Sequence, residues 1–178
     1  MRHPSFSRLP STLAFVVVIV LASCALPRQG HVRPTRLFQA FVIEEHLPFT
    51  AVGPYRLEGQ AFLRQQGGGV VTCAGALVLV SPATDFVREV LAYTRADGDL
   101  VLHKAANNAF VNLTRTTQCD AQSNFSMSGL PAGRWIVTVV VSWQVAGARQ
   151  GGALQREVQV PTQDRVLLTD QDLVGFAR

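Results

Sequence analysis

The chain has 178 residues, a length typical of one domain or of two small ones. Its hydrophobic fraction of 48% excludes wholesale disorder, and its charged fraction of 16% is too low for a coiled coil or a nucleic-acid tail. The formal net charge is +4, and it falls to +2 if the segment that contains Arg2 and Arg8 is removed, so no nucleic-acid partner is expected.

The first residues are typical of an export signal. Arg2 and Arg8 give a basic start, and residues 13–22 form an unbroken apolar run. As a helix, this run would span roughly 15 Å at ~1.5 Å per residue, about half of a ~30 Å hydrocarbon core. A short apolar run behind a basic start therefore predicts a cleaved signal rather than a membrane span.

The apolar run ends in Leu21-Ala22-Ser23-Cys24, which resembles the lipobox of bacterial lipoproteins. In that family the signal is cut just before the cysteine, which then carries a diacylglycerol on sulfur and a fatty acid such as palmitate on nitrogen. The resemblance implies a membrane partner through lipid on Cys24. Ala25, in place of the Asp typical of inner-membrane lipoproteins, favours the outer membrane facing the periplasm. The alternatives are an ordinary signal peptide with a chance cysteine and a buried apolar strand.

Residues 25–36 contain prolines, a glycine and several arginines, a composition typical of a flexible tether. A segment of this length reaches at most roughly 40 Å when extended. The chain is therefore predicted to comprise a signal peptide (1–23), a lipidated N-terminus with its tether (24–36) and a single folded domain (37–178) of the cell envelope.

Lipid on Cys24 would leave two cysteines, Cys73 and Cys119, in an oxidising compartment. A disulfide between them is the obvious pairing, and closing a loop of 46 positions would stabilise the fold by roughly 4 kcal/mol before any strain. Two buried free thiols are the alternative. No metal or other cofactor is predicted, because neither cysteine belongs to a C-x-x-C pair and the histidines are scattered without ligand spacing.

The folded domain begins with an ambiguous segment, residues 37–47, which fits either a short helix or a lead-in strand. From Tyr55 onward, apolar and polar residues alternate as in a β-strand, and residues 76–80 are apolar on both faces, as in a central strand. The period changes at residues 84–94, where apolar residues recur at helical spacing. Residues 100–109 show no clear pattern.

The C-terminal half is predicted to consist of strands. Strands are expected at residues 111–118 and around Phe125, and the strongest alternation runs from Trp135 to Trp143. Residues 145–153, which are rich in glycine, are predicted to form a loop before two more short strands. Short strands separated by Gly/Pro turns predict an all-β, antiparallel β-sandwich or barrel with one short helical insertion.

Several motifs of the domain resemble the carboxypeptidase regulatory-like domain, a small transthyretin-like β-sandwich. They are Gly59-Gln60-Ala61, Ala74-Gly75-Ala76-Leu77-Val78-Leu79, Thr116-Thr117-x-x-Asp120-x-x-Ser123-Asn124-Phe125 and Leu130-Pro131-Ala132-Gly133-x-Trp135-x-Val137. The resemblance implies a transthyretin-like or immunoglobulin-like sandwich over residues 57–169, with residues 84–108 inserted, and a structural or binding role. Ser123 departs from the pattern, because the family has glycine at this turn, and Cys119 occupies a turn position.

An enzyme is not expected, because the sequence has no G-x-S-x-G, H-E-x-x-H or phosphate-loop motif. The leading interpretation is a non-catalytic, lipid-anchored envelope protein that holds a partner protein or a cell-wall polymer. The alternative is a carbohydrate- or peptide-binding module of a transport or degradation system, in which Trp135 and Trp143 would stack on the ligand. These tryptophans share a strand face, and a core position is the commoner use of such a face. A hydrolase is the third interpretation.

Overall fold

A computed structural model of the chain describes residues 35–38, 41–95, 99–102 and 104–174. The predicted signal sequence, the lipobox and Cys24 lie outside these residues, so the anchoring hypothesis stays a prediction. None of the helices within the described ranges combines the length and the apolar character that crossing a bilayer requires.

The first of the two main sheets is built around β2 (Tyr55–Arg64). β7 (Asn124–Leu130) pairs with the first part of β2, and β3 (Val70–Thr72) pairs with its last part, both in antiparallel orientation. β10 (Val166–Leu168) joins β2 in parallel. The long strand β2 therefore positions all the other strands of this sheet.

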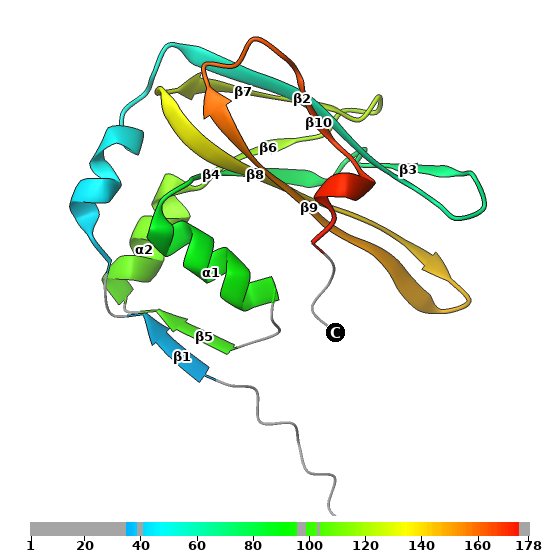
Figure 1. Ribbon diagram of the computed structural model, residues 1–178, viewed down its shortest axis with the longest axis horizontal. Helices are drawn as coiled ribbons and strands as arrows, with labels where there is room; N and C mark the ends of the chain where they lie inside the picture. Colours follow the sequence, from blue (N-terminus) through cyan, green and yellow to red (C-terminus); the bar gives the residue numbers. More distant parts are fainter. Residues whose placement is uncertain (1–34, 39–40, 96–98, 103, 175–178) are drawn as a thin grey trace, which may run out of the picture. The chain divides into compact units, whose positions relative to one another are not determined.

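The second sheet has the strand order β6 (Arg115–Gln118), β4 (Leu77–Pro82), β8 (Gly133–Val145) and β9 (Ala148–Val160), and every neighbouring pair is antiparallel. The two sheets form the layers seen in Figure 1, and one core cluster takes its residues from both. The predicted all-β, antiparallel sandwich is therefore confirmed, and β4 is a central strand of its sheet, as its apolar sequence predicts.

The core lies between the sheets because the strands turn alternate residues inward. On β2, Leu57, Ala61 and Leu63 are buried, whereas Glu58 and Arg64 are exposed. The alternation expected from Tyr55 onward is thus confirmed residue by residue. The largest fully buried side chains are Trp135, Leu57, Leu63, Leu130, Leu154 and Leu168.

A long hairpin replaces the loop predicted at residues 145–153. β8 and β9 pair without interruption from Gly133↔Val160 to Val145↔Ala148. The turn consists of Ala146 and Gly147, both at positive φ (48° and 81°), a conformation that matches the twist of a hairpin with a two-residue turn. The loop prediction was wrong because it took the glycines of this segment as strand breakers.

α1 (Asp85–Arg95) confirms the helix predicted at residues 84–94. It begins where the hydroxyl of Thr84 accepts a hydrogen bond from the backbone N–H of Val87, as an N-cap residue does. The apolar side of α1 packs against Ile136 on the outer face of β8 and forms a second, smaller core there. The helical insertion therefore covers the face of the second sheet that is turned away from the first.

The insertion is larger than the one helix predicted. α2 (Lys104–Leu113) follows α1, and between them β5 (Asp99–Leu102) pairs in parallel with β1 (Thr35–Phe38). The segment 100–109 shows no clear pattern because it contains part of a strand and part of a helix. The strand expected from residue 111 begins only at Arg115, after α2 has ended.

The ambiguous segment 37–47 contains parts of both forms expected for it. Residues 37–38 end β1, residues 43–45 form the 3₁₀ helix η1 (Ile43–Glu45), and residue 47 begins a second 3₁₀ helix, η2 (Leu47–Phe49). Pro48 lies inside η2, where a proline suits a single tight turn but would not suit the interior of a longer helix.

Candidate functional site

The two tryptophans share one strand face, as predicted, but occupy different environments. Trp135 is 0% exposed, its Nε1–H donates to the carbonyl of Pro131 at 3.2 Å, and its ring meets Phe49 edge-on at 5.2 Å. A ligand-stacking role for Trp135 is therefore wrong, because no face of the ring reaches solvent. Trp143, at the far end of β8, is half-buried and packs against the edge of the core.

Arg115 packs against the Trp135 ring at the edge of the core. Its guanidinium carbon lies 5.4 Å from the indole centroid, and its N–H groups donate to the carbonyls of Phe49, Ala51 and Gly129. Burial lowers the pKa of Arg115. The side chain joins the η2 segment to β7 and the core, which is a structural role.

Trp143 lines a groove of about 680 Å³ at one end of the sandwich. The groove lies where the end of β2 and its following turn, the β8–β9 hairpin and the C-terminal segment come together. In Figure 1 the turns of the β2–β3 and β8–β9 hairpins project from this same end. The lining residues are Leu63, Arg64, Gln65, Gln66, Gly67, Trp143, Val145, Gln150, Gly151, Asp170 and Leu173.

The position of the Trp143 ring depends on Gly151 of the neighbouring strand β9. Gly151 has φ +95°, and a Cβ atom there would lie 2.2 Å from the carbonyl oxygen of Val141 and 3.0 Å from Cζ3 of the Trp143 ring. Only glycine tolerates both the backbone conformation and this close approach. The indole can therefore lie close against β9 and form a wall of the groove.

η3 (Asp170–Asp172) borders the groove through Asp170. The carboxylate of Asp170 accepts a hydrogen bond from the backbone N–H of Arg64 at 3.1 Å, which ties η3 to the end of β2. The buried carboxylate of Asp172 accepts two hydrogen bonds from Arg156 of β9, at 2.7 and 2.8 Å. A bidentate pair of this kind adds geometric definition, so η3 is held from both sheets.

The polar groups of the groove are mainly side-chain amides. Gln65, Gln66 and Gln150 each carry two donors and an acceptor, and Asp170 adds a carboxylate acceptor. An aromatic wall beside a few convergent polar groups is the usual composition of a small-molecule site. This combination suits a ligand with both apolar ring faces and many hydroxyl groups.

Sequence reasoning identified Trp143 but missed the amides and Asp170. Gln65 and Gln66 follow β2 in the turn before β3, for which no binding role was expected, and Gln150 falls in the predicted loop. One signal in the sequence could have located these amides. Gln66 precedes Gly67 near the turn of one hairpin and Gln150 precedes Gly151 near the turn of the other, and the turns of the two hairpins lie at the same end of the sandwich (Figure 1).

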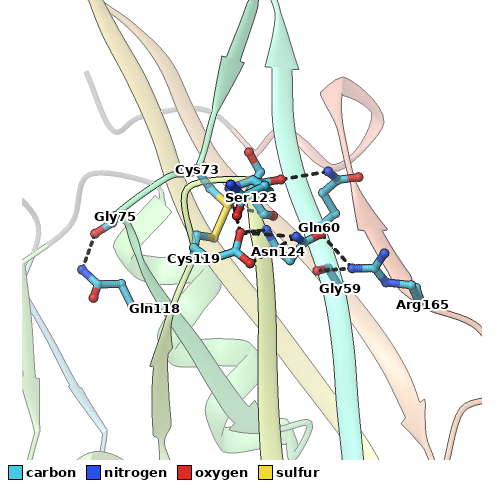
Figure 2. Close-up of a disulfide and its surroundings, with 11 residues drawn as sticks. Gly59, Gln60, Cys73, Gly75, Gln118, Cys119, Ser123, Asn124 and Arg165 are labelled. Atoms are coloured by element: carbon cyan, nitrogen blue, oxygen red, sulfur yellow. Dashed lines mark hydrogen bonds between the residues drawn. A yellow bond between two sulfur atoms is a disulfide. The ribbon is translucent and has the colours of Figure 1, made fainter.

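The disulfide between Cys73 and Cys119 is present, with the two Cα atoms 5.8 Å apart. Both cysteines are buried, at 1% and 4% exposure. Figure 2 shows the bond between the segment that leads from β3 into β4 and the turn that leads from β6 into β7. It therefore links two places where the chain passes from one sheet to the other.

The turn after Cys119 is organised by Asp120. Its Oδ1 accepts hydrogen bonds from the backbone N–H groups of Asn124 at 2.8 Å and Gln122 at 2.9 Å. These bonds lower the pKa of Asp120 from its ordinary 3.8, and the bond from Asn124 has the largest effect. Arg165 donates to the side-chain oxygen of Asn124 at 2.8 Å (Figure 2). Ser123 has φ +67° here, a left-handed backbone conformation that favours glycine.

Replacing Ser123 with Gly should stabilise the protein by about 1 kcal/mol. A left-handed backbone disfavours any residue with a Cβ by roughly 1–2 kcal/mol, which exceeds the roughly 0.4–1 kcal/mol that glycine adds to the freedom of the unfolded chain. The hydroxyl of Ser123 is also buried and has no hydrogen-bond partner within the described ranges. Urea unfolding of Ser123→Ala measures the effect of the buried hydroxyl, and Ser123→Gly adds the effect of the left-handed backbone. An unfolding midpoint of Ser123→Gly below that of the wild type would contradict this interpretation of the turn.

His46 does not line the groove. His46 is buried, and its ring nitrogens lie 2.8 Å from the carbonyl oxygen of Val42 and 3.0 Å from the hydroxyl of Thr84, which makes it a structural residue. Across the described ranges, His, Cys, Asp and Glu form no group that could hold a metal ion.

The chain is similar in structure to a candidate carbohydrate-binding protein of Pseudomonas aeruginosa, with a TM-score of 0.60 and 22% identity over 72% of this chain and 97% of that one. It also matches the major pilin subunit of Bacillus cereus, with a TM-score of 0.35 and 13% identity over 67% of this chain and 29% of the pilin. No protein-family model matches the chain. No curated protein matches it either. The first similarity shows a shared β-sandwich fold, and the second is too low to support an argument.

Proposed function

We propose that this protein is a saccharide-binding module and that the groove beside Trp143 holds the ligand. The observation that carries the proposal is a half-buried indole, backed by a glycine, in a groove whose polar groups are mainly amides. The fold shared with a candidate carbohydrate-binding protein supports the same class of ligand. The absence of a catalytic motif from the sequence favours binding without catalysis.

The test is binding of the full chain to a panel of immobilised polysaccharides: cellulose, dextran, alginate, hyaluronan, polygalacturonate and peptidoglycan. Trp143→Ala should weaken binding about tenfold or more, because truncation of a central aromatic anchor removes a large share of binding energy. Gln144→Ala is the matched control, since Gln144 is the next residue of β8 and does not line the groove. Binding to no polysaccharide, or equal loss in both variants, would contradict the proposal.

We also propose that the domain is held at the outer membrane, facing the periplasm, by lipid on Cys24. The support is the sequence Leu21-Ala22-Ser23-Cys24 behind a basic start and a short apolar run. Kinship with the carboxypeptidase regulatory-like domain is likewise a proposal, supported by the motifs around Ser123 and Trp135. On this account the anchored module would bind a cell-wall or surface polymer near the membrane.

Cys24→Ser should abolish labelling with a fatty-acid analogue and move the protein from the membrane fraction to the aqueous fraction. The reason is that two or three acyl chains supply the whole membrane affinity, at ~0.8 kcal/mol for each buried CH₂ group. Fractionation and acyl labelling in a bacterial host measure both effects, with Cys73→Ser/Cys119→Ser as a control that should remain labelled. A Cys24→Ser protein that is still acylated and membrane-bound would refute the anchor.

A further inference from the structure

A second cavity adjoins the groove and shares Arg64 with it. This cavity, of about 370 Å³, lies on the side of the first sheet that faces away from the core. Its lining residues are Gln60, Phe62, Arg64, Val70, Thr72, Ala121, Gln122 and Ser123. None of these is acidic, and amide and hydroxyl groups supply most of its polar side chains. Arg64 therefore stands at the junction of two cavities that both suit a hydroxyl-rich ligand.

Arg64 differs from the other arginines of this face of the sheet. Arg56 pairs with Glu58 at 2.9 Å, and Arg165 donates to Asn124 at 2.8 Å. The side chain of Arg64, in contrast, is exposed and forms no ion pair with any residue of the described ranges. Its positive charge is therefore open to an external anion.

The position of the guanidinium of Arg64 is set by Phe62. The guanidinium carbon lies 5.6 Å from the centroid of the Phe62 ring, which is within the range of a cation–π contact. The two residues are on the same face of β2, two positions apart, so the strand itself places one over the other. Contact with the ring restricts the arginine before any ligand arrives, and less entropy is lost on binding.

The chemistry of a guanidinium selects its partner. Its planar fork of N–H donors matches the two oxygens of a carboxylate, and such charge-assisted bonds are roughly twice as strong as neutral ones. The groove also contains Asp170, whose oxygen already accepts the backbone N–H of Arg64. The second cavity has no acidic lining residue, so an anion is favoured on that side of the junction.

We propose that the ligand is an acidic saccharide of at least two sugar units, which spans the groove and the second cavity and places a carboxylate on Arg64. This inference rests on the proposed saccharide-binding function and adds the charge and the length of the ligand. Phe62 is a positioning residue on this account, because it acts through Arg64.

The experiment compares each acidic polysaccharide of the panel (alginate, hyaluronan, polygalacturonate) with its own methyl ester, using the full chain. The wild type should bind at least one acid about tenfold or more better than the corresponding ester, in keeping with the strength of hydrogen bonds between charged groups. In Arg64→Gln the affinity for the acid should fall to that for the ester. Arg64→Lys should restore only part of the preference, since a lysine keeps the charge but loses the fork and the stacking.

Arg56→Gln is the matched control, because it removes the same charge from the same face of β2 at a position that lines neither cavity. It should leave the preference for the acid unchanged, whereas Phe62→Leu should reduce it. If the wild type binds acids and esters equally well, and Trp143→Ala loses this binding, this inference is overturned and the proposed function stands. Binding to no saccharide would overturn both, and loss of the preference in Arg56→Gln would show that only net charge matters.

Discussion

Removing the disulfide by Cys73→Ala/Cys119→Ala should lower the free energy of unfolding by about 2–4 kcal/mol. The bond closes a loop with a sequence separation of 46, and the loop-closure entropy for that length lies at the upper end of this range. Because the bond joins the β3–β4 and β6–β7 connections, breaking it frees two crossings between the sheets at once. Alanine avoids the hydroxyl groups that serine would bury in the core.

Urea unfolding of the two proteins measures this loss. The comparison is made in a Cys24→Ser background, so that thiol titration of the denatured, unreduced protein counts only these two sulfurs. No titratable thiol is expected before reduction, and two after it. Two thiols without reduction would refute the bond, and an unchanged unfolding midpoint would refute its contribution to stability.

Trp135→Ala should lower the free energy of unfolding by about 3–5 kcal/mol, the usual range for truncation of a large buried aromatic residue. Trp135 is fully buried between the sheets, its N–H is satisfied by Pro131, and its ring contacts both Phe49 and Arg115. Its removal would leave a cavity and would free the guanidinium of Arg115 from its aromatic contact. Trp135 lies on β8, which is paired with a strand on each side, and this pairing limits collapse into the space.

The matched variant is Trp143→Ala on the same strand face. Trp143 is half-buried at the rim of the core, so its loss should cost much less stability, while it should cost saccharide binding. Equilibrium unfolding and binding assays on both variants separate the two roles. Comparable destabilisation by both substitutions would contradict the assignment of one tryptophan to the core and the other to the groove.

The strands could be predicted wherever one side faced the core. The alternation in β2 is clear because Leu57, Ala61 and Leu63 must be buried while their neighbours need not be. The pattern fails where a strand extends beyond the core: the tips of β8 and β9 are exposed on both faces, and nothing in their sequence requires alternation. The parallel β1–β5 pair depends on contacts between segments far apart in the chain, which periodicity does not report.

The candidate site was predictable only in part. Trp143 could be found as an aromatic residue on a strand, but the same pattern also fits Trp135, and only packing distinguishes them. The polar side of the groove combines Gln65, Gln150 and Asp170 from three distant segments. No local spacing connects these residues, because they are brought together by the β2–β3 turn, the β8–β9 hairpin and the contacts of η3.

The position of the ligand can be tested directly by nuclear magnetic resonance of the indole N–H groups, since the chain has two tryptophans. Titration of ¹⁵N-labelled protein with an oligosaccharide of a polymer that it binds should shift the indole signal of Trp143 and leave that of Trp135, which is bonded to Pro131, unchanged. Trp143→Phe assigns the signals. Saturable binding that leaves the Trp143 signal unmoved would contradict the saccharide site in this groove.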